Sequence, residues 1–228
     1  MTRRSGFTLA EVLITLGIIG VVAAMTIPNL IANTNGAKFR SQFKKSISTL
    51  NQAGLMAQAQ YDFDYAGTSE ACSDTTADAA KEHPEVTMTF CSILNGTLTG
   101  QTYVGLASNL TRNANGSSVS YSWGRATTIG DPGDYYAYTL ADGSIVGFNT
   151  AAKACELPIG SQLNAAVLGG SDANADLSNC RGFIDVNGVT LPNKEVNCAG
   201  SKSAAVQTPC TVKNSANEMT DVFPIVFH

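Results

Sequence analysis

A run of apolar side chains over residues 7–31 is the strongest pattern in this sequence. Glu11 is its only ionisable residue. About 22 apolar-rich residues at 1.5 Å each form a helix of roughly 33 Å, which is long enough to cross the hydrocarbon core of a bilayer. The run therefore predicts a helix that spans a membrane.

The helical pattern continues from Asn29 to about Tyr61. Apolar or small residues recur there at spacings of three and four, the period of one helix face. The members of this stripe are Phe39, Phe43, Ile47, Leu50 and Gly54. We expect residues 32–61 to be the amphipathic half of one long helix, with the stripe packed against a globular domain.

Beyond residue 61 the pattern changes to short alternating runs, which are typical of strands. Alternation is clear over residues 86–90, at Val119, Tyr121 and Trp123, and over the runs 135–140 and 144–148. An Asp-Gly pair at 142–143 separates the last two runs and is a hairpin signal. The predicted fold class is α+β, with the long helix packed on an antiparallel sheet in one domain over residues 62–228.

All six cysteines follow the helix, and they predict disulfides. The chain contains no CxxC and only two histidines, so neither a zinc cluster nor a thioredoxin-like site is favoured. An even count outside the membrane segment indicates three bridges, and fifteen connectivities are possible. Our hypothesis is neighbour pairing: Cys72 with Cys91, Cys155 with Cys180, and Cys198 with Cys210.

Composition adds little in favour of a catalytic or nucleic-acid-binding role. The 228 residues carry a formal net charge of −4, which provides no general footprint for nucleic acid. His83 lies in an acidic polar stretch and His228 is the last residue of the sequence, so neither has the context of a catalytic base. A glycine-rich phosphate-binding loop is absent from the sequence. We therefore expect no enzymatic activity.

One segment weakly resembles the start of a calcium loop. Asp172, Asn174 and Asp176 place oxygen ligands at alternate positions. However, Leu177 occupies the position that requires glycine, and Phe183 occupies that of the bidentate glutamate. These three residues are weak calcium candidates, and no cofactor is expected.

Glu11 distinguishes the first segment from a plain anchor or a secretory signal. Arg3 and Arg4 favour a cytoplasmic amino end, so the remainder is expected to be exported. An acidic side chain inside a spanning helix costs about 3 kcal/mol and usually marks function. A simple anchor does not explain it, and Ala23-Ala24-Met25 is a poor signal-peptidase site.

The residues GFTLAEVL at 6–13, preceded by two arginines, resemble the processing site of type IV prepilins and of type II secretion pseudopilins. This resemblance implies cleavage between Gly6 and Phe7, methylation of the new Phe7 amine, and pairing of that amine with Glu11 of a neighbouring subunit. Residues 1–6 would then be a leader peptide, whose removal leaves 12 basic against 18 acidic side chains, or −6.

The same resemblance implies a structural subunit of a filament. It is held in the inner membrane by a single pass, amino end in the cytoplasm, and is then assembled through residues 7–31 into an extracellular pilus or a periplasmic pseudopilus. The implied partners are identical or related subunits, a prepilin peptidase, an assembly ATPase and a platform protein. Gly17, Gly20 and Pro28 are expected to mark where the helix unwinds. Residues 182–193 and 221–227 resemble terminal sheet elements of such domains, with 194–220 inserted between them.

Two alternatives to a major pilus subunit remain open. The chain could be a secretion pseudopilin, or a minor pilin that displays an adhesive or DNA-binding tip.

The sign of the charge changes along the chain after residue 61. Residues 33–61 hold four basic side chains and no acid, whereas residues 62–85 hold seven acids and one lysine. These segments could be two solvated surfaces, or the acidic loop of one subunit could contact the basic helix face of the next.

Overall fold

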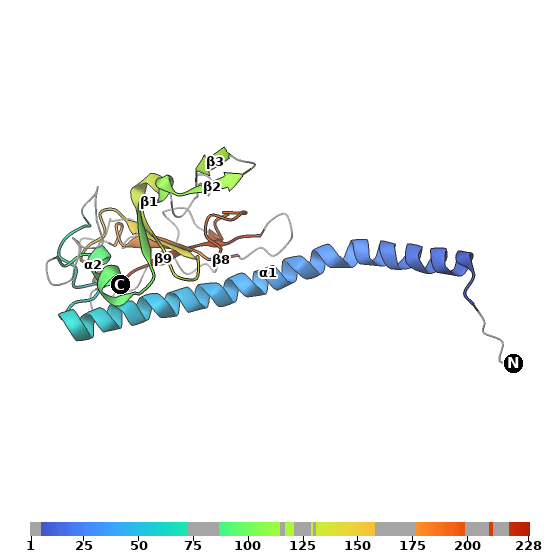
Figure 1. Ribbon diagram of the computed structural model, residues 1–228. Helices are drawn as coiled ribbons and strands as arrows, with labels where there is room; N and C mark the ends of the chain where they lie inside the picture. Colours follow the sequence, from blue (N-terminus) through green and yellow to red (C-terminus); the bar gives the residue numbers. More distant parts are fainter. Residues whose placement is uncertain are drawn as a thin grey trace.

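The computed structural model describes residues 6–72, 87–114, 117–120, 129, 131–157, 177–198, 210–211 and 219–228. A single helix, α1, runs over Leu9–Tyr61, and its amino-terminal half extends beyond the domain (Figure 1). The rest of the described chain gathers on one side of the other half. This is the predicted architecture of one long helix packed on an antiparallel sheet.

The domain is built on a five-stranded sheet of order β1-β4-β5-β6-β9, in which all neighbours are antiparallel. Its strands are β1 (Thr102–Leu106), β4 (Tyr135–Thr139), β5 (Ile145–Asn149), β6 (Arg181–Asp185) and β9 (Val222–Val226). Two small two-stranded ladders accompany it: β2 (Thr111–Ala114) with β3 (Ser117–Ser120), and β7 (Asn197–Cys198) with β8 (Cys210–Thr211). The short helices are α2 (Phe90–Thr97), η1 (Ala107–Asn109) and η2 (Pro132–Asp134).

The outer half of α1 is part of the domain core, as its apolar stripe predicts. Phe39 and Leu50 are buried, and Phe43 stacks on Phe223 of β9 with ring centroids 4.5 Å apart. Tyr65, from the loop after α1, donates its hydroxyl to the Leu50 carbonyl at 3.0 Å. A Cβ at Gly54 would lie 3.0 Å from the Tyr65 ring, so the small residue admits this close approach.

The hairpin predicted around Asp142-Gly143 is confirmed as β4 and β5. The Asp142 carboxylate accepts from the Ser144 amide at 3.1 Å, and Gly143 adopts φ +84°, a backbone conformation that favours glycine. Asp142 also accepts from Lys45 of α1 at 2.8 Å. Burial raises the pKa of Asp142, but the hydrogen bonds from Lys45 and Ser144 outweigh it and lower the pKa to about 2.

The strand predicted over residues 86–90 is wrong. Residues 87–89 of this run are not in a strand, and Phe90 begins α2. Thr89 caps that helix: its hydroxyl accepts from the Ser92 amide at 3.1 Å, and its own amide donates to the Ser92 hydroxyl at 3.0 Å. This reciprocal cap favours a helix start over a strand, and the fully buried Phe90 anchors it in the core.

The inserted segment between β6 and β9 is fastened by a buried carboxylate. Asp221, which is fully buried, accepts from the Asn193 and Lys194 amides at 2.9 and 2.7 Å. Burial raises the pKa of Asp221 to about 6, against the lowering effect of these amides. The contact fixes the loop that follows β6 at the edge of the sheet where β9 begins.

Candidate functional site

The sequence-predicted processing and assembly residues lie together at the start of α1. Gly6, Phe7 and Thr8 precede the helix in an extended segment, and Phe7 is 88% exposed. A Cβ at Gly6 would meet nothing within 4 Å. Packing inside this chain therefore does not require glycine at position 6.

Glu11 is held by a capping box that our sequence reasoning missed. The Thr8 amide and the Thr8 hydroxyl both donate to Oε2 of Glu11 at 2.8 Å, and the Glu11 amide donates to the Thr8 hydroxyl at 3.3 Å. The spacing of Thr8 and Glu11 is the signal that could have revealed it. The carboxylate thus accepts hydrogen bonds within its own chain, before any neighbouring subunit is considered.

The two hydrogen bonds that the Glu11 carboxylate accepts, from the Thr8 amide and the Thr8 hydroxyl, both end on Oε2. Within the described part of the chain, Oε1 has no hydrogen-bond partner, and the side chain is exposed. Since a carboxylate oxygen accepts more than one hydrogen bond, Oε1 can receive a further donor while Oε2 caps the helix. The capped geometry therefore leaves the site open to an external cation.

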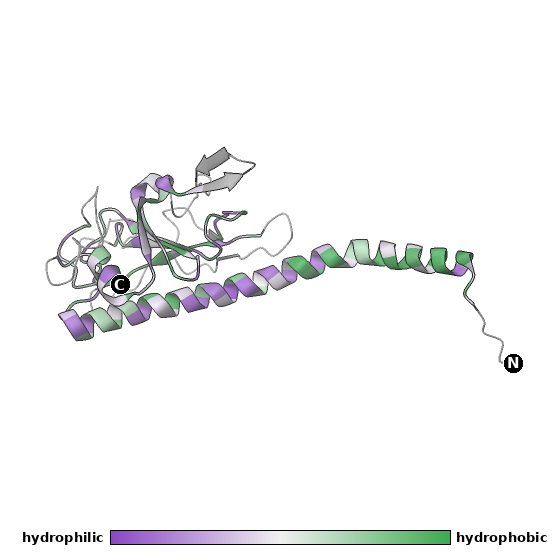
Figure 2. Cartoon of the chain, in the orientation of Figure 1, coloured by the Kyte–Doolittle hydropathy of each residue, from purple (hydrophilic) through white to green (hydrophobic). Residues whose placement is uncertain are grey.

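The helix that follows is apolar and uncovered. It contains an 18-residue window of mean hydropathy 2.2, none of which is buried in the chain, so by length and composition it can cross a membrane. In Figure 2 its amino-terminal half is mostly green, whereas the half beside the domain carries most of the purple. The described part of the domain therefore leaves this window uncovered.

The residues expected to unwind the helix do not interrupt it. α1 passes through Gly17, Gly20 and Pro28 as one continuous helix. A Cβ at either glycine would meet nothing within 4 Å, so packing within the chain does not explain them. Unwinding at these three positions stays a prediction for the assembled state.

Two disulfides fasten the segments around the outer end of α1. Cys72 is bonded to Cys91 in the first turn of α2, and Cys155 is bonded to Cys180 just before β6. Both are among the neighbour pairs of our hypothesis. Cys198 of β7 lies opposite Cys210 of β8 in the ladder register, and their disulfide stays a prediction.

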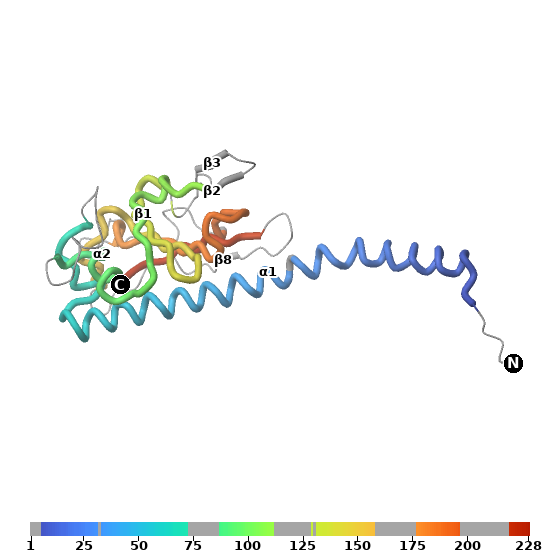
Figure 3. Tube along the Cα trace, in the orientation of Figure 1, coloured from blue at the N-terminus to red at the C-terminus, as the bar shows by residue number. Residues whose placement is uncertain are grey.

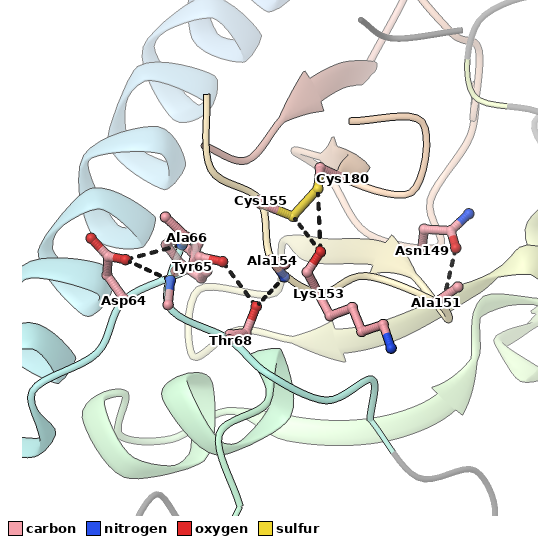
Figure 4. The surroundings of a disulfide bond; sticks show 11 residues. Asp64, Tyr65, Ala66, Thr68, Asn149, Ala151, Lys153, Ala154, Cys155 and Cys180 are labelled. Carbon is pink, nitrogen blue, oxygen red and sulfur yellow. Dashed lines mark hydrogen bonds between the residues drawn. A yellow bond between two sulfur atoms is a disulfide. The ribbon is translucent and has the colours of Figure 1, made fainter. Parts of the chain in front are cut away.

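Figure 4 shows the surroundings of the Cys155–Cys180 bond. The Ala154 amide, next to the disulfide, donates to the carbonyl and to the hydroxyl of Thr68 at 2.8 and 3.0 Å. The Thr68 hydroxyl in turn donates to the Tyr65 carbonyl at 2.9 Å. The loop after α1 is thereby joined to the segment after β5.

The calcium candidates Asp172, Asn174 and Asp176 lie outside the described residues. Among the residues that the structure describes, no group of three or more histidine, cysteine or acidic side chains is placed to hold a metal ion. The candidate functional features in the described part of the chain are therefore the capping box at Thr8 and Glu11, the two disulfides and the apolar half of α1.

Residues 1–27 match the model of a family described as the prokaryotic N-terminal methylation motif. This motif is typical of type IV pilins and type II pseudopilins, which are structural proteins and not enzymes. No curated protein and no solved structure matches the chain. The match covers the extended segment before α1, the capping box and the apolar helix that follows.

Proposed function

We propose that this protein is a structural subunit of a type IV pilus or a related filament, made as a membrane-anchored precursor. The observation that carries the proposal is the combination of the methylation motif at residues 1–27 with a helix half that the domain leaves uncovered. An apolar helix of this length needs lipid or other apolar helices around it. A filament supplies the second environment once the subunit leaves the membrane.

In this proposal a prepilin peptidase cuts between Gly6 and Phe7, and the new Phe7 amine is methylated. Residues 1–6 are the leader, residues 7–31 span the inner membrane with the amino end in the cytoplasm, and residues 32–61 join them to the exported domain at 62–228. An assembly ATPase and a platform protein move the mature subunit into the filament.

Glu11 serves two purposes in the assembled state. Its Oε2 keeps the helix capped through Thr8, and its Oε1 accepts the methylated amine of a neighbouring Phe7. In an interior that excludes water, this ion pair fixes the axial register between subunits, because leaving either charge unpaired costs several kcal/mol. Maturation and assembly are thereby coupled, since cleavage creates the amine.

The experiment is mass spectrometry of sheared surface fibres and of the membrane fraction. We expect the mature chain to begin with methylated Phe7. Abundance of that chain in surface fibres identifies a pilus subunit, and its confinement to the cell envelope identifies a secretion pseudopilin. A mature chain that still begins with Met1 contradicts the proposal.

A further inference from the structure

A dense group of cations follows the apolar half of α1. Lys38, Arg40, Lys44 and Lys45 lie within eight residues, and we call them the basic collar. Successive residues of an α-helix are rotated by about 100°, so Lys38 and Lys45 lie on one flank of the packed stripe, and Arg40 and Lys44 lie on the other. Figure 2 shows that purple, hydrophilic residues recur along α1 after its mostly green half.

The chain neutralises only one member of the collar among the residues described. Lys45 forms an ion pair with Asp142 at 2.8 Å. Lys38, Arg40 and Lys44 are exposed, and none of them forms an ion pair with a described residue. Three cations spread over about 9 Å of the helix therefore have no ion-pair partner in the described part of the chain.

Helix geometry places the collar just outside the apolar segment. Lys38 lies seven residues beyond Ile31, or about 10 Å along the axis, and Lys44 lies about 20 Å beyond it. The headgroup layer adds roughly 5–8 Å outside the hydrocarbon core, and attraction to its charges acts over about one Debye length, near 10 Å. The stems of lysine and arginine extend this reach, so Lys38 and Arg40 reach headgroup level when residue 31 ends the hydrocarbon span, and the charges of Lys44 and Lys45 lie within about one Debye length of that level.

An exposed leucine lies at the same edge of the domain. Leu191 is 59% exposed and belongs to the loop after β6. A Cβ at Gly188 of that loop would lie 2.5 Å from the Gly143 carbonyl, next to the Asp142 that binds Lys45. In Figures 1 and 3 this orange segment lies at the end of the domain nearer the apolar half of α1.

We propose that the basic collar and Leu191 form a membrane-facing surface that binds anionic phospholipid headgroups and holds the domain against the bilayer before assembly. The inference rests on the proposed function, because it requires residues 7–31 to span the membrane. Basic residues beside a membrane span are usually retained on the cytoplasmic side. Four of them on the exported side oppose that tendency, and attraction to anionic lipids in the leaflet that they face would offset it.

The test uses the full chain in nanodiscs made of phosphatidylcholine alone or with about 30 mol % phosphatidylglycerol. An amine-acetylating reagent is added, and the modification rate of each lysine is measured by mass spectrometry. Lys153 is the internal control, because it is exposed and lies beside the Cys155–Cys180 bond near the far end of α1. Resistance of the chain to alkaline extraction is verified first, so that failure to span the membrane is recognised as failure of the proposed function.

We expect phosphatidylglycerol to slow acetylation of Lys38 and Lys44 by about threefold or more, with Lys153 unchanged and with reversal in about 0.5 M salt. Lys45 should show a similar lipid-dependent protection in the wild type, and the Lys38→Gln/Lys44→Gln variant should remove it, because the rigid helix and domain are then no longer tilted toward the bilayer by the collar. The Lys153→Glu variant has the same change in net charge and should keep that protection. Equal acetylation rates in both lipids overturn the proposal. Protection that depends on protein concentration and not on lipid also overturns it, and assigns the collar to an acidic loop of a second copy.

Discussion

Replacing Glu11 by glutamine separates the two roles proposed for this side chain. Glutamine retains an amide oxygen that can accept from Thr8, so the capping box persists, but the negative charge is lost. Replacing Thr8 by alanine does the opposite, because the hydroxyl is removed and the charge remains. Alanine at position 11 removes both.

The expected magnitudes differ enough to tell these roles apart. An amine left unpaired in a dry filament interior costs about 3–5 kcal/mol, which corresponds to a loss of incorporation of roughly a hundredfold to several thousandfold. Loss of the cap costs about 1 kcal/mol, or roughly fivefold. We therefore expect Glu11→Gln to be nearly as defective as Glu11→Ala, and Thr8→Ala to be only mildly defective.

The assay is competition within one cell. Wild-type and variant chains are co-expressed, and the ratio of their amino-terminal peptides that begin at Phe7, which the substitution distinguishes by mass, is measured in the filament and in the membrane. Because only mature chains are counted, a change in cleavage efficiency does not affect the comparison. Wild-type incorporation of Glu11→Gln would refute the ion pair, and equal defects in Thr8→Ala and Glu11→Ala would show that capping alone matters.

Three further predictions concern the domain. Gly147→Ala should destabilise it by about 1–3 kcal/mol in chemical denaturation, because the Phe183 ring leaves no room for a Cβ, whereas Gly20→Ala, where a Cβ meets nothing within 4 Å, should leave the denaturation midpoint unchanged. The pKa of Asp221, raised from its ordinary 3.8 to about 6, predicts that the free energy of unfolding falls by about 2 kcal/mol as pH rises from about 4 to 6, since the folded state holds the proton longer; Asp221→Asn should abolish this slope, and a flat profile in the wild type would contradict it. Replacing both Cys155 and Cys180 by alanine should cost about 3 kcal/mol from loop entropy across the 25-residue separation, and an unchanged denaturation midpoint would show that the bridge does not constrain the unfolded chain.

The pattern of apolar and turn residues predicted two parts of this fold, the packed face of α1 and the central hairpin. The stripe from Phe39 to Gly54 identified the packed face of α1, because only a helix brings those positions together. The Asp142-Gly143 turn identified the central hairpin for the same kind of reason, since few other structures tolerate that pair between alternating runs. Both signals are local in the sequence.

The errors arose where a cap decided between two local structures. Alternation over residues 86–90 suggested a strand, but the Thr89–Ser92 pair begins α2 there. The Thr8–Glu11 pair was overlooked in the same way, because the carboxylate was considered only as a buried charge. The Lys45–Asp142 contact joins residues 97 positions apart, and no sequence pattern could have placed them together.

The outer half of α1 both continues the apolar half and is part of the domain core, since Phe39, Leu50 and Ala57 are buried with the sheet. Tension applied to the proposed filament would therefore act directly on the folded domain, without a hinge to absorb it. Sliding the helix past the sheet requires separating Phe43 from Phe223 and breaking the hydrogen bond from Tyr65 to the Leu50 carbonyl. The mechanical strength of each subunit is then limited by how strongly its own helix is packed, and single-molecule pulling would measure that limit.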